Sequence, residues 1–145
     1  MMKIVIGSDH AGFSLKEFLK KYLSEKGYVV IDKGTYSSDS VDYPDYGHAI
    51  ANAVLNKECD FGIAICGSGN GINMAVNKHK GIRGALCWNA EIARLAKQHN
   101  NANVISLPGR FIDEKTAIDI LEAYINAEFE GGRHQKRIEK IDMCC

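Results

Sequence analysis

The sequence lacks the features of a membrane protein and of a protein that binds polyanions. Its 145 residues carry 18 basic and 18 acidic side chains, so the formal net charge is zero. No overall field therefore favours nucleic acid or an acidic membrane surface, and affinity for an anion must come from a local cluster. The longest apolar stretches have only a few residues, whereas about 20 are needed to span a bilayer. We expect neither a nucleic-acid partner nor a membrane partner.

The chain also lacks the cysteine pairs of a zinc site and the segments of a secretory signal. Its five cysteines, at positions 59, 66, 87, 144 and 145, are odd in number and include no C-x-x-C pair. The N-terminus "MMKIVIGSDHAGF" has no long apolar region and no small-residue cleavage site, so it is expected to be mature protein. These absences predict a reduced, cytoplasmic protein.

Short β-branched runs alternate with amphipathic segments along the whole chain. Buried strands are predicted at residues 3–7, 28–32, 61–66, 83–87 and 103–107. Strands that alternate with helices predict an α/β fold whose parallel sheet is covered on both faces. The length suits one domain, residues 1–145, with a core of useful size.

Start and stop signals place several helices between the strands. Ser14 is a candidate N-cap for a helix that Gly27 ends, and a second helix follows Pro44. Asp113 is predicted to open another helix, and a short, partly exposed helix is predicted after the "EGG" at residues 130–132.

Polar residues and glycines are concentrated where the predicted strands end. Ligands of open α/β sheets bind beyond the carboxyl ends of the strands. In this chain those ends carry residues 7–13, 32–46, 66–71, 87–91 and 107–111. The candidate site is therefore sought there.

The segment "CGSGNG" at residues 66–71 joins a strand to a predicted helix. Its glycines allow backbone N–H groups to converge on an anion. A dinucleotide site is disfavoured because Met74 stands where the third glycine of G-x-G-x-x-G belongs, and the lysine of a Walker loop is missing. Two interpretations stay open, a tight turn without a ligand and a cradle for a small oxyanion or phosphate.

Cys66 opens this loop, and two titratable residues end the first strand. A cysteine at the end of a buried strand is commonly a packing residue. A thiol at the start of a helix, however, has a lowered pKa, and its thiolate can act as a nucleophile or a base. Asp9 and His10 are either capping residues or partners of Cys66 in catalysis. Cys59 and Cys87 are expected to be structural.

Further candidates lie before and after the last strand. His99 precedes that strand and is grouped with Asp9 and His10, whereas His48, His79 and His134 have no comparable placement. Arg133 and Arg137 are four residues apart and would share one helix face, as a phosphate clamp requires. The alternative for them is a solvated, charged tail. Arg110 is a third candidate for the clamp.

Seven further segments follow one another in order along the chain: "GSDHAGFSLK", "IDKGTYSSDSVDYPDY", "CGSGNG", "NKHKGIR", "QHNNANV", "GRF" and "EGGRHQKR". Together they resemble the type B ribose-5-phosphate isomerases, a family that includes allose- and galactose-6-phosphate isomerases. The resemblance implies a three-layer α/β/α, Rossmann-like fold with strand order 2-1-3-5-4. It also implies interconversion of ribose 5-phosphate and ribulose 5-phosphate without metal or cofactor.

The resemblance further implies roles for individual residues. Cys66 is the base that moves a proton between C2 and C1, His99 opens the sugar ring, and Asp9 holds the substrate hydroxyls. The loop N–H groups would stabilise the enediolate oxygen. The residues implied to bind substrate are His10, Tyr43, Gly67, Ser68, Gly69, Asn70, Gly71, Asn100, Arg110, Arg133 and Arg137.

The same resemblance implies a homodimer with shared active sites, which can pair further into a tetramer, and a C-terminal segment 130–145 that packs on the partner subunit. Ser68 replaces the threonine that is common in the family, which could widen the pocket. A hexose-6-phosphate isomerase, or an enzyme of dual specificity that also accepts free aldoses, is therefore an alternative. A non-catalytic phosphosugar-binding module is disfavoured, because it would not need Cys66, His99 and Asp9 together.

Overall fold

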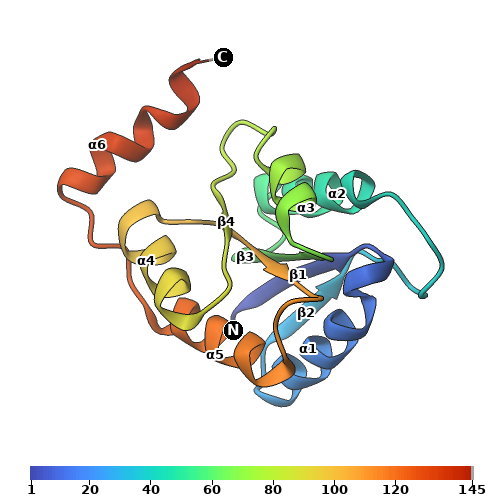
Figure 1. Ribbon diagram of the computed structural model, residues 1–145. Helices are drawn as coiled ribbons and strands as arrows, with labels where there is room; N and C mark the ends of the chain where they lie inside the picture. Colours follow the sequence, from blue (N-terminus) through green and yellow to red (C-terminus); the bar gives the residue numbers. More distant parts are fainter. Residues whose placement is uncertain (145) are drawn as a thin grey trace.

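The computed structural model describes residues 1–144, and Cys145, the end of the expected C-terminal segment, lies outside them. Its centre is a five-stranded sheet in which all strand pairs are parallel (Figure 1). The order of the strands is β2-β1-β3-β5-β4, which confirms the expected fold class. The strands are β1 (Lys3–Ser8), β2 (Val29–Asp32), β3 (Phe61–Cys66), β4 (Gly84–Leu86) and β5 (Val104–Pro108).

Helices connect the strands and continue after the last one. They are η1 (His10–Gly12), α1 (Phe13–Glu25), α2 (Tyr43–Leu55), α3 (Asn70–Val76), α4 (Ala90–Asn100), α5 (Glu114–Asn126), α6 (Arg133–Glu139) and η2 (Ile141–Cys144). Within residues 1–144, no helix combines the length and the apolar character that a membrane-spanning helix requires.

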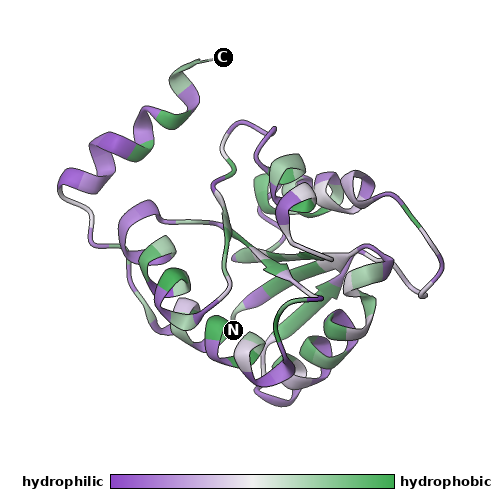
Figure 2. Cartoon of the chain, viewed as in Figure 1, coloured by the Kyte–Doolittle hydropathy of each residue, from purple (hydrophilic) through white to green (hydrophobic). Residues whose placement is uncertain are grey.

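The sheet has a hydrophobic core on each face. Helices α1, α4 and α5 cover one face and contribute Leu19, Ala93 and Leu121 to its core. Helices α2 and α3 cover the other face, with Ile50 and Ile72 in its core. Figure 2 shows the hydrophobic strands between helices whose outer faces are hydrophilic. Burying each large aliphatic side chain stabilises the fold by about 1.5–3 kcal/mol, so the sheet is a rigid support for the loops at its edges.

Most of the predicted helix ends are confirmed, and one is wrong. Asp113 accepts a hydrogen bond from Thr116 N at 2.8 Å and caps α5, and Gly27 follows the end of α1 with a φ of +93°. Ser14, however, is not an N-cap. The short helix η1 runs directly into α1, so Phe13 N donates to His10 O and Gly12 takes the capping position.

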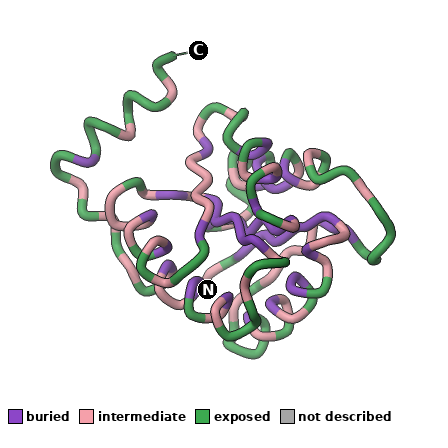
Figure 3. Tube along the Cα trace, viewed as in Figure 1, coloured by how far each residue is buried: buried purple, intermediate pink, exposed green. Residues whose placement is uncertain are grey.

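The chain after α5 leaves the body of the domain at the amino edge of the sheet. Register pairs Gly62 with Val104 and Cys66 with Pro108, so the residues before β5 lie at the opposite edge from Cys66. Helix α6 contacts α4 near this amino edge and otherwise projects away (Figure 1). Figure 3 shows that α6 is largely exposed, in contrast to the buried strands.

Candidate active site

Cys66 and Asp9 are neighbours at the carboxyl edge of the sheet. The parallel register pairs Ser8 with Ile65, and Asp9 and Cys66 are the next residues on each strand. Asp9 N donates a hydrogen bond to Ile65 O at 3.2 Å, so the pairing of the two chains continues to this point. Adjacent strands lie about 4.8 Å apart. A thiol and a carboxylate are therefore placed side by side by the central strands.

The side chain of Cys66 is turned toward α2 and α3. Alternate residues of a strand face opposite sides of the sheet, and Cys66 belongs to the core that α2 and α3 cover. Its exposure is 5%, and that of Asp9 is 6%. Asp9 Oδ1 also accepts a hydrogen bond from Gly12 N at 3.1 Å, so the carboxylate caps η1. Capping fixes the position of Asp9, and it leaves the second carboxylate oxygen for a ligand.

The glycine loop 67–71 lies between Cys66 and α3. Gly69 adopts a φ of +77° at the N-cap of α3, which reverses the chain toward the helix. The Arg110 side chain lies over Gly67, where an added Cβ would be 3.3 Å from its Nη1. The ring of Tyr43 packs on Gly71, where an added Cβ would be 2.6 Å from Tyr43 Cζ. The glycines thus allow a tyrosine and an arginine to approach the loop backbone closely.

Two more of the predicted residues complete this edge. His10 Nδ1 accepts a hydrogen bond from Val41 N at 3.2 Å, which ties the segment before α2 to the end of β1. The exposed Ser68 accepts hydrogen bonds from the backbone and side chain of Asn70, at 3.3 and 3.2 Å. We call the set that the structure assembles here the carboxyl-edge group. It consists of Asp9, His10, Tyr43, Cys66, Gly67–Gly71 and Arg110.

Replacing Gly69 with alanine should destabilise the protein more than the same change at Gly27. Both glycines have positive φ, but an added Cβ at Gly69 would lie 2.5 Å from Leu86 Cδ1 and 3.1 Å from the Leu107 carbonyl carbon, whereas nothing lies within 4 Å at Gly27. Backbone strain is common to both variants, and overpacking at Gly69 should add about 1–3 kcal/mol. Urea unfolding at one protein concentration measures the difference. Equal losses of stability would show that the loop tolerates a side chain there.

The other predicted residues form an amino-edge group, made of His99, Asn100, Arg133 and Arg137. His99 and Asn100 end α4, and Arg83 holds this end by donating to the carbonyls of Asn100 and Asn101. Arg133 and Arg137 lie one turn apart on α6, as predicted.

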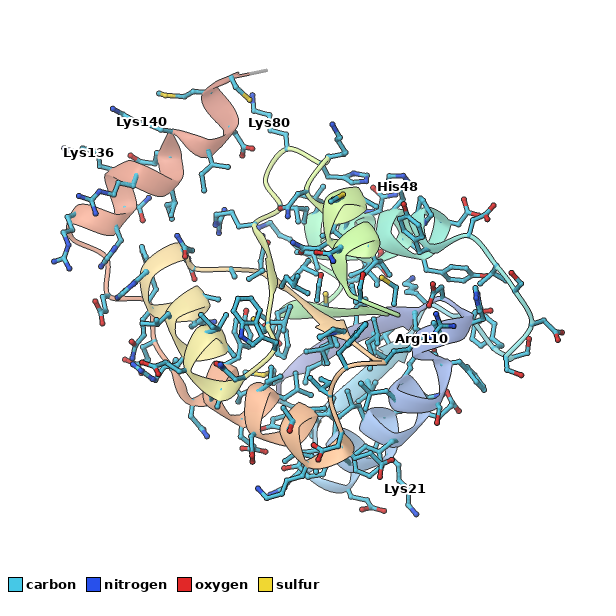
Figure 4. The ribbon with its side chains drawn as sticks, in the orientation of Figure 1. Lys21, His48, Lys80, Arg110, Lys136 and Lys140 are labelled. Carbon is cyan, nitrogen blue, oxygen red and sulfur yellow. The ribbon has the colours of Figure 1, made fainter. Side chains whose placement is uncertain are left out.

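Within one chain, the prediction that His99 lies with Asp9 and His10 is wrong, because His99 lies at the opposite edge of the sheet. The two edges are separated by at least the length of β5. From Val104 to Pro108 this strand advances four residues, or about 13 Å. A residue that precedes a parallel strand lies at its amino edge, and only a residue that follows the strand reaches the carboxyl edge. In Figure 4, Arg110 is at the carboxyl edge, while Lys136 and Lys140 project from α6 on the far side of the molecule.

Sequence reasoning also missed contacts between histidines. His134 stacks on His99, with ring centroids 4.4 Å apart, and is buried. His79 is half-buried, and its Nε2 lies 2.7 Å from Nδ1 of the exposed His48. Burial, together with the charge of His48, lowers the pKa of His79. The two histidines of each pair are distant in sequence, so no local spacing of residues predicts that they are in contact.

The remaining core cysteines are structural, as expected. Cys87 is fully buried, and burial raises its pKa to about 12. Cys59 is partly buried against the α2–α3 core, and burial raises its pKa as well. Both thiols therefore stay protonated at neutral pH.

In both sequence and structure, the chain is similar to a class of enzymes, the sugar-phosphate isomerases. The ribose/galactose isomerase family matches residues 4–141, so the chain belongs to this family.

Individual relatives match over nearly their whole length. The chain is 47% identical to ribose-5-phosphate isomerase B of Escherichia coli over 141 residues, which are 97% of this chain and 95% of the relative. A ribose 5-phosphate isomerase of Thermotoga maritima has a TM-score of 0.97 and 51% identity, with 98% of both chains covered. Ribose-5-phosphate isomerase B of Mycoplasma genitalium with bound ribulose 5-phosphate has a TM-score of 0.92 and 43% identity, with 97% of this chain and 94% of that chain covered.

Proposed function

We propose that the protein interconverts D-ribose 5-phosphate and D-ribulose 5-phosphate, a step of the pentose phosphate pathway, with Cys66 as the base. The thiolate removes the proton from C2 of the open aldose, and an enediolate forms. The same proton returns to C1 and gives the ketose. Asp9 holds the substrate hydroxyls and moves a proton between O1 and O2. Proton transfers alone complete this reaction, so the proposal includes no metal and no cofactor.

The observation that carries this proposal is the register of Asp9 and Cys66 beside the glycine loop. A general base must be within hydrogen-bond reach of the proton that it removes. Negative charge then develops on the substrate oxygens, and fixed N–H donors stabilise it without reorganisation. The loop 67–71 begins at the residue after the thiol. The base can therefore reach C1 and C2 of the substrate while the N–H donors face the oxygens bound to these two carbons. Membership of the isomerase family supports the same chemistry.

We further propose that each active site takes its amino-edge group from the partner subunit of a homodimer. His99, Asn100, Arg133 and Arg137 lie too far from Cys66 of their own chain to share a substrate with it. Helix α6 projects from the domain and carries the two arginines with it. A twofold axis makes such an exchange reciprocal, so one dimer holds two complete sites. Two dimers can pair further into a tetramer.

The phosphate is bound by arginines from both groups. Arg133 and Arg137 share one face of α6, and charge-assisted hydrogen bonds to phosphate are among the stronger polar contacts. Arg110 and His10 approach from the carboxyl edge, and Asn100 approaches from the end of α4. The N–H groups of the glycine loop then bind the enediolate oxygens rather than the phosphate. A thiolate base needs a reduced cysteine, which fits a reducing compartment such as the cytoplasm.

Turnover of ribose 5-phosphate in a coupled assay tests the proposed function. Ribose 5-phosphate should be isomerised faster than allose 6-phosphate, and both faster than the free sugars. Ser68 favours the alternative of a dual-specificity enzyme, because it is smaller than threonine and lies at the mouth of the site. Faster turnover of allose 6-phosphate or galactose 6-phosphate would assign the enzyme to hexose phosphates instead. Phosphosugar binding without any turnover would leave only a binding module.

Replacing His99 with asparagine should make spontaneous ring opening limit the forward reaction. Ribose 5-phosphate is mostly a closed furanose, and His99 is proposed to protonate the ring oxygen. Ribulose 5-phosphate stays open, because its O5 carries the phosphate. With the variant, the forward rate should level off as enzyme concentration rises, while the reverse rate stays proportional to it. A forward rate that stays proportional at wild-type level would refute the role of His99.

Replacing Arg133 or Arg137 with alanine should weaken the binding of phosphorylated substrate. A lost charge-assisted hydrogen bond is worth about 1.5–3 kcal/mol, or about 10- to 150-fold in KM for ribose 5-phosphate. Turnover of free ribose or allose should change much less. Lys136→Ala is the matched control, because Lys136 lies on the same helix between the two arginines. Equal losses on phosphorylated and free sugars would show that the arginines do not bind the phosphate.

A further inference from the structure

His99, Glu130 and His134 form a cluster that the proposed reaction does not explain, and we call it the histidine–glutamate cluster. His99 lies in the last turn of α4, and His134 lies in the first turn of α6. Glu130 lies between α5 and α6, and its backbone N donates to Gln98 O at 3.0 Å. This hydrogen bond fixes the segment before α6 against the end of α4. The three side chains therefore come from the end of α4 and from the segment 130–134, which are anchored to each other.

The geometry of the cluster brings three metal-ligand atoms together. Glu130 Oε1 lies 3.4 Å from His134 Nε2 and 3.8 Å from His99 Nε2. The two imidazole rings are stacked, with an interplanar angle of 12°. One ligand atom from each residue can be chosen so that all three lie within 4.8 Å of one another.

His134 is buried, although the helix that carries it is exposed. Its side chain is 9% exposed, and within residues 1–144 it is the one buried residue of α6. Its Nε2 is buried and forms no hydrogen bond, although Glu130 Oε1 lies 3.4 Å away. A buried polar atom without a hydrogen-bond partner destabilises a fold. The orphaned nitrogen faces Glu130 and His99, so it points to a ligand at this position.

We propose that the histidine–glutamate cluster binds a divalent transition-metal ion, with Zn²⁺ as the ion that fits best. Imidazole nitrogens and a carboxylate oxygen are typical zinc ligands, and bonds of about 2.0–2.1 Å place tetrahedral ligands about 3.3 Å apart. The separations of 3.4 and 3.8 Å are close to this value.

A modest movement of His99 completes the ligand set. The three ligand atoms lie within 4.8 Å of one another, so the two most distant must approach each other by up to about 1.5 Å for a tetrahedral ion. His99 is 38% exposed, so its ring is free to tilt out of the stack, while His134 stays fixed by burial. Water fills the fourth position. The adjacent Arg133 opposes a cation, so binding is weaker than at a closed site of four protein ligands.

The consequence for catalysis rests on the proposed function. Coordination uses the lone pair of His99 Nε2 and releases any proton there to solvent. His99 Nε2 then has no proton to deliver to the sugar ring, and the coordinated ring is held in the cluster rather than against the substrate. The ion therefore inhibits the forward reaction and is not a cofactor of it.

Titration of the full-length protein with Co²⁺, followed by its visible absorption, tests the site directly. Zn²⁺ should then displace the Co²⁺. Cys144→Ser and Cys145→Ser are introduced in every sample, because terminal thiols also bind these ions. We expect one Co²⁺ per chain, with nitrogen and oxygen ligands and no sulfur-to-cobalt band. Glu130→Gln and His134→Asn should each weaken binding by at least about tenfold, since even outer-shell partners of a metal contribute that much.

His79→Asn is the matched control, because it removes the His48–His79 pair and leaves the cluster intact. Unchanged binding in this variant supports the proposal, and loss of binding there overturns it. No saturable binding, or binding that neither Glu130→Gln nor His134→Asn weakens, also overturns it. If His134→Asn does not fold, Glu130→Gln decides, because its side chain is 48% exposed. Binding as expected without zinc inhibition would keep the metal site and refute the role of His99 in ring opening.

Discussion

The Cys66→Ala variant should lose isomerase activity while it keeps its fold and its affinity for phosphosugars. Removal of a general base reduces the rate by about 10²- to 10⁴-fold. No other titratable residue of the carboxyl-edge group directly precedes the glycine loop, so none replaces Cys66 as the base. The loop N–H groups and the arginines are unchanged, so substrate binding remains. A coupled assay measures turnover, and equilibrium binding of ribose 5-phosphate measures affinity.

Cys87→Ala is the matched control for this experiment. Cys87 is also a buried cysteine at the carboxyl end of a strand, and it packs on the opposite face of the sheet. Both variants lose one sulfur atom from a core, so a general effect of packing would reduce activity equally in both. Turnover close to that of the wild type in Cys66→Ala would exclude the thiol as the base.

Alkylation gives an independent measurement on the same thiol. Iodoacetamide should inactivate the enzyme, and ribose 5-phosphate should protect it. Cys59 and Cys87 should react slowly, because burial raises the pKa of each thiol. The exposed Cys144 is removed by Cys144→Ser, so that modification there is not mistaken for modification of Cys66. Inactivation that substrate does not slow would contradict the assignment.

Mixing Cys66→Ala with Arg137→Ala subunits should restore activity that neither variant has alone at low substrate concentration. Cys66 lies in the carboxyl-edge group and Arg137 in the amino-edge group. If each site combines the two groups from different chains, a heterodimer has one site with both defects and one with neither. Random pairing makes half of the dimers heterodimers, so roughly a quarter of wild-type activity should return, by the reciprocity of a twofold interface.

The control for this mixture is Cys66→Ala with Asp9→Asn. Both residues belong to the carboxyl-edge group, so every site of that heterodimer has one defect and no activity should return. Formation of mixed dimers is checked with subunits that carry different tags. Mixed dimers of Cys66→Ala and Arg137→Ala that stay inactive would show that each site is built within one chain.

Local patterns in the sequence predicted the five strands and most of the helices. The runs at 61–66 and 103–107 are apolar and β-branched because their strands are buried on both faces, and the observed strands begin and end within one residue of these bounds. Asp113 and Gly27 mark helix ends through interactions with their own neighbours. The prediction of Ser14 as an N-cap was wrong, because η1 precedes α1 directly and Gly12 occupies the N-cap position.

The sequence by itself also predicted the candidate residues of both groups, through seven segments that resemble one enzyme family. It did not determine which of those residues meet within one chain. Strand direction and crossover geometry decide that Asp9 lies beside Cys66 and that His99 lies at the opposite edge. These are long-range properties, because they depend on the pairing of β1, β3 and β5. The burial of His134 and its stacking on His99 were decided at the same level, since they depend on how the segment after α5 docks against the end of α4.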